Sequence, residues 1–184
     1  PEHKPTSAML LGTLTHCAVL EPDELTKRFV AVSSRTTKKG KEEAKEAEEK
    51  GMTAVTESDM ANAIKMRDAV FAEPHAKKLL GFGIAEKSYW WEDTTSGLTC
   101  KCRPDWLNKE TIVDLKTSRT GANPRDFAKA VANFKYHLQC AHYLSGIPSA
   151  KRFIFLVVQS EYPFDVGLWE LDDDALQEGQ KLSR

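Results

Sequence analysis

The sequence is poor in cysteine and has no long apolar run. Only four of its 184 residues are cysteine, and no hydrophobic stretch reaches the length of a transmembrane helix, about 20 residues. No signal-peptide pattern opens the chain. Few cysteines without a secretory signal favour free thiols over a disulfide framework. We therefore expect a cytoplasmic protein with no membrane partner.

The cysteine spacing argues against the common thiolate metal sites. One residue separates Cys100 from Cys102, whereas a zinc knuckle uses two residues between its cysteines and a second pair. An iron–sulfur cluster needs four closely grouped thiolates, and Cys17 and Cys140 are remote in sequence. We expect no iron–sulfur cluster, and we interpret Cys100 and Cys102 as small core residues on one strand face.

The net charge is also small, at −1, so the chain as a whole does not attract nucleic acid. The charge is nevertheless unevenly distributed. Residues 101–152 contain ten Lys or Arg and four Asp or Glu, whereas residues 153–184 contain two and seven. A basic middle segment allows an anionic ligand on one face. Ordinary variation in surface charge also accounts for it.

The hydrophobic pattern predicts a mixed α/β fold. The length suits a single domain over residues 1–184, and the start at Pro rather than Met leads us to expect a fragment of a longer chain. Apolar periodicity predicts helices at 9–20, 58–71 (capped by Ser58), 75–80, 124–144 and 172–182, with a solvated helix or mobile loop at 35–50. Apolar or alternating runs predict strands at 86–92, 98–103, 111–116, 152–159 and 164–171, with a loop at 107–110.

One of these strands carries an acid and a lysine on the same face. In the strand at 111–116, Asp114 and Lys116 point one way while Val113 and Leu115 point the other. The chain has four Asp/Glu-x-Lys triplets, and only this one lies in an apolar strand. Burying charged groups is costly unless they pair or bind a metal. The pair is therefore either a catalytic element or a structural ion pair at a sheet edge.

Two further features extend this pattern. Asp105 follows the preceding strand, and two carboxylates on neighbouring strand ends form an oxygen-rich site that suits Mg²⁺. Asp105 could instead cap a turn after Pro104. Tyr136, Gln139 and Tyr143 recur at helical spacing and form a polar stripe. Such a stripe contacts substrate, braces the lysine, or marks an amphipathic boundary.

In combination these segments resemble a known nuclease family. The order GTLTH (12–16), CRPDW (102–106), IVDLKTS (112–118) and YHLQCAHY (136–143) resembles the RecB-type branch of the PD-(D/E)-x-K nucleases, above all the catalytic domain of RecE-like exonucleases of bacteria and phages. The resemblance spans residues 11–171. It implies a restriction-endonuclease-like α/β core, a mixed central β-sheet flanked by helices. The segment that usually precedes the G-T-x-x-H helix is missing or truncated here.

The resemblance also implies roles for individual residues. Metal ligands are implied at His16, Asp105 and Asp114, together with the Leu115 carbonyl, and catalytic roles at Lys116, Gln139 and Tyr143. Glu86 matches an acid on the family's first strand only weakly, because many exposed strands carry a Glu. Without its motif, His16 would be interpreted as an ordinary helix histidine. Its place within G-T-x-x-H favours a ligand.

The implied activity is a Mg²⁺-dependent DNA exonuclease, with Mn²⁺ as a substitute. The enzyme would resect one strand of linear double-stranded DNA from 5′ to 3′, assemble as a ring-shaped homo-oligomer, and supply a 3′ overhang to a strand-annealing recombinase. Contacts with DNA phosphates are expected from Arg119, Arg125 and Lys129. The alternatives are an endonuclease or repair nuclease of the same superfamily and a non-catalytic DNA-binding module. CRISPR-associated adaptation nucleases share the motif order, but their four cluster cysteines do not match the spacing here.

Overall fold

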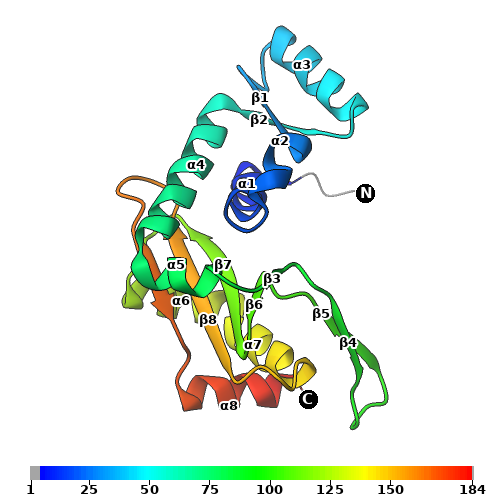
Figure 1. Cartoon of the computed structure of the whole chain (residues 1–184), viewed down its shortest axis with the longest axis vertical. Coiled ribbons are helices and arrows are strands. Elements are labelled where there is room, and N and C mark those ends of the chain that lie inside the picture. The colour runs from blue at the N-terminus through cyan, green and yellow to red at the C-terminus, as the bar shows by residue number, and fades with distance from the viewer. Residues whose placement is uncertain (1–4, 184) are drawn as a thin grey trace.

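The computed structural model describes residues 5–183, and its centre is a five-stranded mixed sheet covered by helices on both faces (Figure 1). The strand order is β3 (Ile84–Ala85), β6 (Trp106–Asn108), β7 (Thr111–Ser118), β8 (Arg152–Gln159) and β9 (Val166–Trp169). Only β7 and β8 run parallel, and the other neighbouring strands are antiparallel. The expected α/β fold with a mixed central sheet is confirmed.

Three helices cover one face of the sheet: α1 (Ser7–Leu20), α4 (Glu57–Ala72) and α5 (Pro74–Leu80). The apolar face of β7, formed by Val113 and Leu115, packs there with Val19, Met66 and Val70. All five side chains are almost completely buried. Burying a side chain of this size stabilises the fold by about 1.5–3 kcal/mol, so this packing fixes α1 against the strand that carries Asp114.

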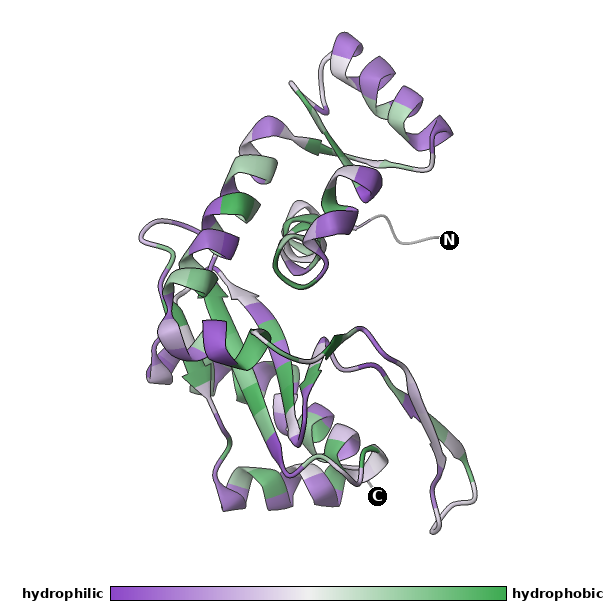
Figure 2. Ribbon diagram, viewed as in Figure 1, coloured by the Kyte–Doolittle hydropathy of each residue, from purple (hydrophilic) through white to green (hydrophobic). Residues whose placement is uncertain are grey.

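The other face is covered by α6 (Pro124–Phe134), α7 (Tyr136–Gly146) and α8 (Asp173–Leu182). Ile112 and Phe155 from the sheet pack there with Phe127 and Cys140. Burial on both faces explains why β8 is apolar along almost its whole length, which Figure 2 shows as a green central strand.

A second, smaller unit is attached through α1 and α4. A short 3₁₀ turn (Pro22–Glu24) and α2 (Leu25–Arg28) lead to β1 (Phe29–Val32), which pairs in parallel with β2 (Thr53–Thr56) around α3 (Lys38–Glu49). Of the two possibilities for residues 35–50, the helix is therefore the one that forms. Neither β1 nor β2 is predicted from the sequence.

The chain from Tyr89 to Cys102 forms a separate hairpin of β4 (Tyr89–Glu92) and β5 (Thr99–Cys102), which projects from the body of the molecule (Figure 1). The predicted strands at 86–92 and 98–103 exist in shortened form, outside the central sheet. Trp91 packs on His142 of α7, with ring centroids 4.8 Å apart. A Cβ atom at Gly146 would lie 2.3 Å from the Trp91 ring, so only glycine fits there.

Three sequence predictions are wrong in detail. Residues 107–110 are not simply a loop, because β6 pairs with both β3 and β7. The cap of α4 is Thr56, which accepts a hydrogen bond from the Asp59 amide, and not Ser58. The helix predicted to run from Pro124 to Leu144 breaks at Lys135, whose φ of 54° and ψ of 43° are left-handed. No Gly or Pro marks this break.

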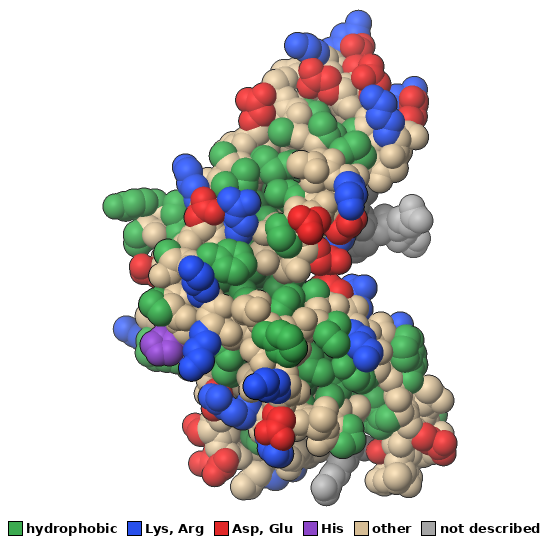
Figure 3. All heavy atoms as spheres, in the orientation of Figure 1, with side chains coloured by type: hydrophobic (Ala, Val, Ile, Leu, Met, Phe, Trp, Pro, Cys, Tyr) green, Lys and Arg blue, Asp and Glu red, His purple; other side chains and the backbone are tan. Residues whose placement is uncertain are grey.

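Charged and apolar side chains alternate over the surface in Figure 3. Lys and Arg gather around α5 in this view, with apolar side chains between them, whereas α3 carries both signs of charge. Within residues 5–183, no helix is long and apolar enough to cross a membrane.

Candidate active site

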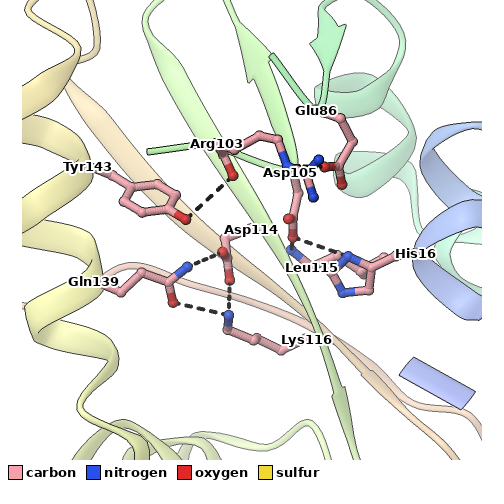
Figure 4. Close-up of polar contacts among 9 residues, drawn as sticks. All are labelled: His16, Glu86, Arg103, Asp105, Asp114, Leu115, Lys116, Gln139 and Tyr143. Atoms are coloured by element: carbon pink, nitrogen blue, oxygen red, sulfur yellow. Dashed lines mark hydrogen bonds and ion pairs between the residues drawn. The ribbon is translucent and has the colours of Figure 1, made fainter. Parts of the chain in front are cut away.

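The candidate site lies where β7 passes between α1 and α7 (Figure 4). Asp114 is 2% exposed, and its carboxylate lies 2.6 Å from the Lys116 ammonium. Gln139 of α7 bridges the two residues: its amide nitrogen donates to Asp114 at 2.6 Å, and its carbonyl oxygen accepts from Lys116 at 3.1 Å. An acid, an amide and a lysine therefore form a closed triangle on one face of the strand.

The rest of the polar stripe on α7 supports this triangle. The Lys116 ammonium lies 4.6 Å from the centre of the Tyr136 ring, a cation–π contact. The Tyr143 hydroxyl donates to the backbone oxygen of Arg103 at 3.4 Å, two residues before Asp105. Tyr136 and Gln139 thus brace the lysine, whereas Tyr143 contacts the backbone before Asp105.

Asp105 lies just before β6, and its side chain contacts the backbone of β7. Its Oδ2 atom accepts a hydrogen bond from the Leu115 amide at 2.7 Å, beyond the last strand pair, Trp106 with Val113. The side chain thus takes the place of a strand partner and does not cap a turn after Pro104. His16 Nδ1 lies 3.5 Å from the same Oδ2 atom.

Glu86 joins this group through a bend that follows β3. Its φ of 51° is left-handed, its amide donates to the Asp105 carbonyl at 3.1 Å, and its carboxylate pairs with Arg103 Nε at 2.9 Å. One ligand atom from each of His16, Glu86 and Asp105 lies within 4.8 Å of the others, so these three could hold a metal ion.

This group differs from the expected ligand set. The group shares His16 and Asp105 with the expected set and adds Glu86. Asp114 lies outside it, with its oxygens against Gln139 and Lys116, and stays a predicted ligand. The sequence interpretation left Glu86 open. Its position depends on a strand of two residues and a left-handed bend, which leave no periodic pattern in the sequence.

The donor set suits a divalent cation. Two carboxylates and one imidazole match Mg²⁺ or Mn²⁺ better than a softer metal. Burial raises the pKa of Asp105 well above its usual value, and the nearby charge of Asp114 raises it further. The Asp114 Oδ2 atom is buried with an ion pair but without a hydrogen bond of good geometry. A cation would relieve this crowding of negative charge.

The two basic residues of the site have shifts of opposite sign. Burial lowers the pKa of His16, so the imidazole is neutral near pH 7, which is the form that binds metals. Burial also acts to lower the pKa of Lys116, but the charge and hydrogen bond of Asp114 outweigh it and raise the value. Lys116 is therefore protonated, and it can donate to an anion rather than accept a proton.

Two pockets follow one another along α1. One, of about 800 Å³, is lined by Gly12, His16, Glu86, Asp105 and Tyr143, among others. The second, of about 480 Å³, begins at Ser7 and Leu11 of the same helix and reaches Lys116, Phe134 and Tyr136. The metal-binding group thus lines one pocket and the lysine lines the other, and α1 lines both.

The three residues expected to bind DNA differ in whether they line a pocket. Arg119 lines the pocket beside Lys116, is 85% exposed, and pairs with Glu161 at 3.2 Å. Arg125 and Lys129 are exposed on the first turns of α6 and line neither pocket. The structure therefore brings only Arg119 to the site.

Comparison with solved structures shows the fold. This chain matches a protein from Eubacterium rectale described as a "putative exonuclease", with a TM-score of 0.70 and 18% identity over 100% of this chain. The match covers 65% of that chain, so this protein spans less than two thirds of the length of the solved structure. The solved structure of SSO0001 matches 68% of this chain and 58% of its own, at 17% identity and a TM-score of 0.37, which is too low to support an argument. The sequence has no match among curated proteins.

A family comparison supplies the assignment. The family described as "PDDEXK-like domain of unknown function (DUF3799)" matches residues 1–183. This match supports the expected PD-(D/E)-x-K superfamily and a nuclease, and it is not specific to the RecE-like branch. Asp105, the D-x-K strand and Gln139 of α7 lie in one region of this fold. The chain belongs to the PDDEXK-like domain family DUF3799.

Proposed function

We propose that this protein is a metal-dependent nuclease that hydrolyses DNA phosphodiester bonds, and that it acts as an exonuclease on linear double-stranded ends. One observation carries the proposal: Lys116 is held by Asp114 and Gln139, and the amide of the preceding residue, Leu115, binds Asp105 of the His16–Glu86–Asp105 group. A basic donor and a cation-binding group are thus adjacent, and each is needed where phosphate charge builds up.

The roles of the residues follow from this geometry. A divalent cation held by His16, Glu86 and Asp105, with Asp114 as the further predicted ligand, would supply Lewis-acid polarisation of the phosphate and a more acidic water. Lys116 donates to a phosphate oxygen and stabilises the charge that develops in the transition state. Asp114 and Gln139 keep its ammonium protonated and aimed at the pocket. Tyr143 holds the Arg103 backbone, and with it the position of Asp105.

The finer parts of the proposal are supported by the family resemblance. These are Mg²⁺ as the natural cation with Mn²⁺ as a substitute, 5′-to-3′ polarity, a 3′ overhang passed to a strand-annealing recombinase, a ring-shaped homo-oligomer and a cytoplasmic location. The description of the Eubacterium rectale protein adds support for end-dependent cleavage. Each part makes a separate claim, so each can fail without the others.

The decisive experiment compares linear and covalently closed duplex DNA. The protein is incubated with each substrate in Mg²⁺ or in EDTA, and the linear DNA is labelled at one end at a time. We expect digestion of linear DNA from the 5′ end in Mg²⁺ alone, with closed circles intact. The Asp114→Asn variant, purified in parallel, controls for a contaminating nuclease. Cleavage of circles would instead identify an endonuclease, and binding without cleavage a non-catalytic module.

The DNA-contact proposal is tested through its salt dependence. Arg119→Ala should weaken binding without sequence preference and flatten the slope of log affinity against log salt by about 1, because one phosphate contact is lost. Arg125→Ala and Lys129→Ala are matched controls, since both residues lie outside the two pockets. Equal effects of all three variants would show that the DNA follows α6 and not the pocket beside Lys116.

A further inference from the structure

The pocket beside Lys116 contains an aromatic pair that the proposed chemistry does not use. Phe134 is 69% exposed, and its ring stacks on Tyr136 with centroids 5.6 Å apart and planes 26° apart. Single exposed aromatic residues are common. This one is placed on a second ring whose neighbour is the Lys116 ammonium, 4.6 Å from the Tyr136 ring centre.

The stacking of Phe134 on Tyr136 depends on a strained backbone between them. Residues two apart in a continuous helix point to different sides, so Phe134 and Tyr136 could not stack if α6 and α7 were one helix. The left-handed Lys135 between them breaks the helix and brings the two rings face to face. A lysine at positive φ is strained, and such strain tends to be kept at functional sites.

The shape and charge of the pocket fit one part of a nucleotide. Its volume of about 480 Å³ lies within the range of pockets that bind small ligands. Phe127, Phe134 and Tyr136 give it aromatic walls, and Lys116 and Arg119 line it as cations. An aromatic wall next to basic groups is the arrangement that holds the base and phosphate of single-stranded nucleic acid.

We infer that this pocket binds an unpaired nucleobase, which stacks on the exposed ring of Phe134 while Lys116 contacts the neighbouring phosphate. The inference rests on the proposed function, because that function places a phosphate at Lys116. It names the substrate as a strand that is unpaired at the site, so a duplex must open by at least one base pair before it is cut. Stacking makes no choice among the four bases, so the pocket is insensitive to sequence.

The test measures binding in EDTA, so that cleavage does not contribute. Short single-stranded oligonucleotides carry 2-aminopurine at one position at a time, because its fluorescence is quenched when it stacks. We expect quenching at one position with the parent protein and with Tyr136→Phe, which keeps the ring. Phe134→Leu should lose that quenching and bind about tenfold or more weakly. Phe82→Leu is the matched control, since Phe82 is 72% exposed and lies in a different pocket.

An abasic nucleotide at the quenched position provides a second readout that needs no variant. It should weaken binding to the parent protein by the same factor and leave Phe134→Leu unaffected. Equal binding of the abasic and normal strands, or equal quenching by Phe134→Leu and the parent, would overturn the inference. If quenching depends on Phe134 but no DNA is cut, the proposed function fails and the base pocket stands. If DNA is cut but neither binding nor quenching depends on Phe134 or on the base, the proposed function stands and the base pocket fails.

Discussion

At the scale of single residues, the proposed site combines one neutralised acid with a second acid that lacks a cationic partner. Asp114 is paired with Lys116 at 2.6 Å, whereas Asp105 contacts an amide and an imidazole that burial keeps neutral. The two acids therefore respond differently to substitution.

Replacing Lys116 should separate catalysis from folding. Lys116→Gln keeps a donor for Asp114 but removes the positive charge, so turnover should fall by a factor of about 100 or more, the scale for losing one transition-state donor. Lys129→Gln is the control, because Lys129 is an exposed lysine paired with Asp126 on α6. Steady-state cleavage rates and thermal melts give both readouts. Cleavage by Lys116→Gln at the parental rate would remove this lysine from the mechanism.

Replacing Asp105 should stabilise the metal-free protein at neutral pH. Burial and the charge of Asp114 raise the folded-state pKa of Asp105, so the unfolding free energy of the parent decreases as pH rises through that pKa. Asp105→Asn removes this loss and keeps an oxygen for the Leu115 amide. We expect a gain of about 0.5–2 kcal/mol at pH 7–8 in EDTA, the scale of single stabilising changes. The gain should shrink as pH falls toward the unfolded-state value of about 4.

The control variant for this prediction should change the free energy of unfolding in the opposite direction. Hydrogen bonds from Asn123 and Lys129 lower the pKa of Asp126, so its charge favours the fold. Asp126→Asn should therefore destabilise the protein at neutral pH. Urea titrations across pH measure both variants. Stabilisation by both, or by neither, would indicate that charge at Asp105 is not the cause.

At the scale of elements, the break between α6 and α7 controls the position of the site. Lys135 ends α6 and precedes α7, so its left-handed backbone determines where Tyr136 and Gln139 begin their stripe. No other residue among those described combines a positive φ with a position between two helices.

Lys135→Gly should raise the free energy of unfolding by about 0.5–1 kcal/mol, because glycine adopts positive φ without steric cost. Lys129→Gly, in the interior of α6, should lower it by about 1 kcal/mol. Chemical denaturation distinguishes the two directions. A loss of stability in Lys135→Gly similar to that of Lys129→Gly would mean that residue 135 adopts a helical backbone in solution.

The same scale explains how much the sequence could predict. Long strands with unambiguous patterns, such as β7 and β8, are predicted close to their true bounds, and the D-x-K and Q-x-x-x-Y motifs lie on them or on α7. β1, β2, β3 and β6 have two to four residues and are not predicted, whereas β4, β5 and β9, also of four residues, are predicted because longer alternating or apolar runs contain them. Glu86 depends on β3 and therefore could not be assigned. The break at Lys135 has no Gly or Pro to mark it, so no local signal predicts it.

At the scale of the whole molecule, the metal-binding group joins segments that are distant in the chain. His16 comes from α1, Glu86 from the end of β3, and Asp105 from the start of β6. A bound cation would therefore link a covering helix to the edge of the sheet, and binding would stabilise the folded state.

This link predicts a thermal shift that depends on His16. Mn²⁺ at about 100 times its dissociation constant should add about 2.7 kcal/mol, or about 5–10 °C in Tm for a chain of this size. His16→Ala should remove most of the shift. His75→Ala, which alters an exposed histidine on α5, should keep it. An unchanged shift in His16→Ala would show that the cation is held by carboxylates alone.

One consequence concerns which substitutions the site tolerates. Leu115, between Asp114 and Lys116, contacts Asp105 through its backbone amide, while its side chain is 1% exposed and packs under α1 and α4. Tolerated substitutions at residue 115 should therefore be limited by core packing and not by the chemistry of the site. Leu115→Ile, Leu115→Val and Leu115→Met variants should each stay functional. Leu115→Pro should not be tolerated, because proline alone lacks the backbone N–H that binds Asp105.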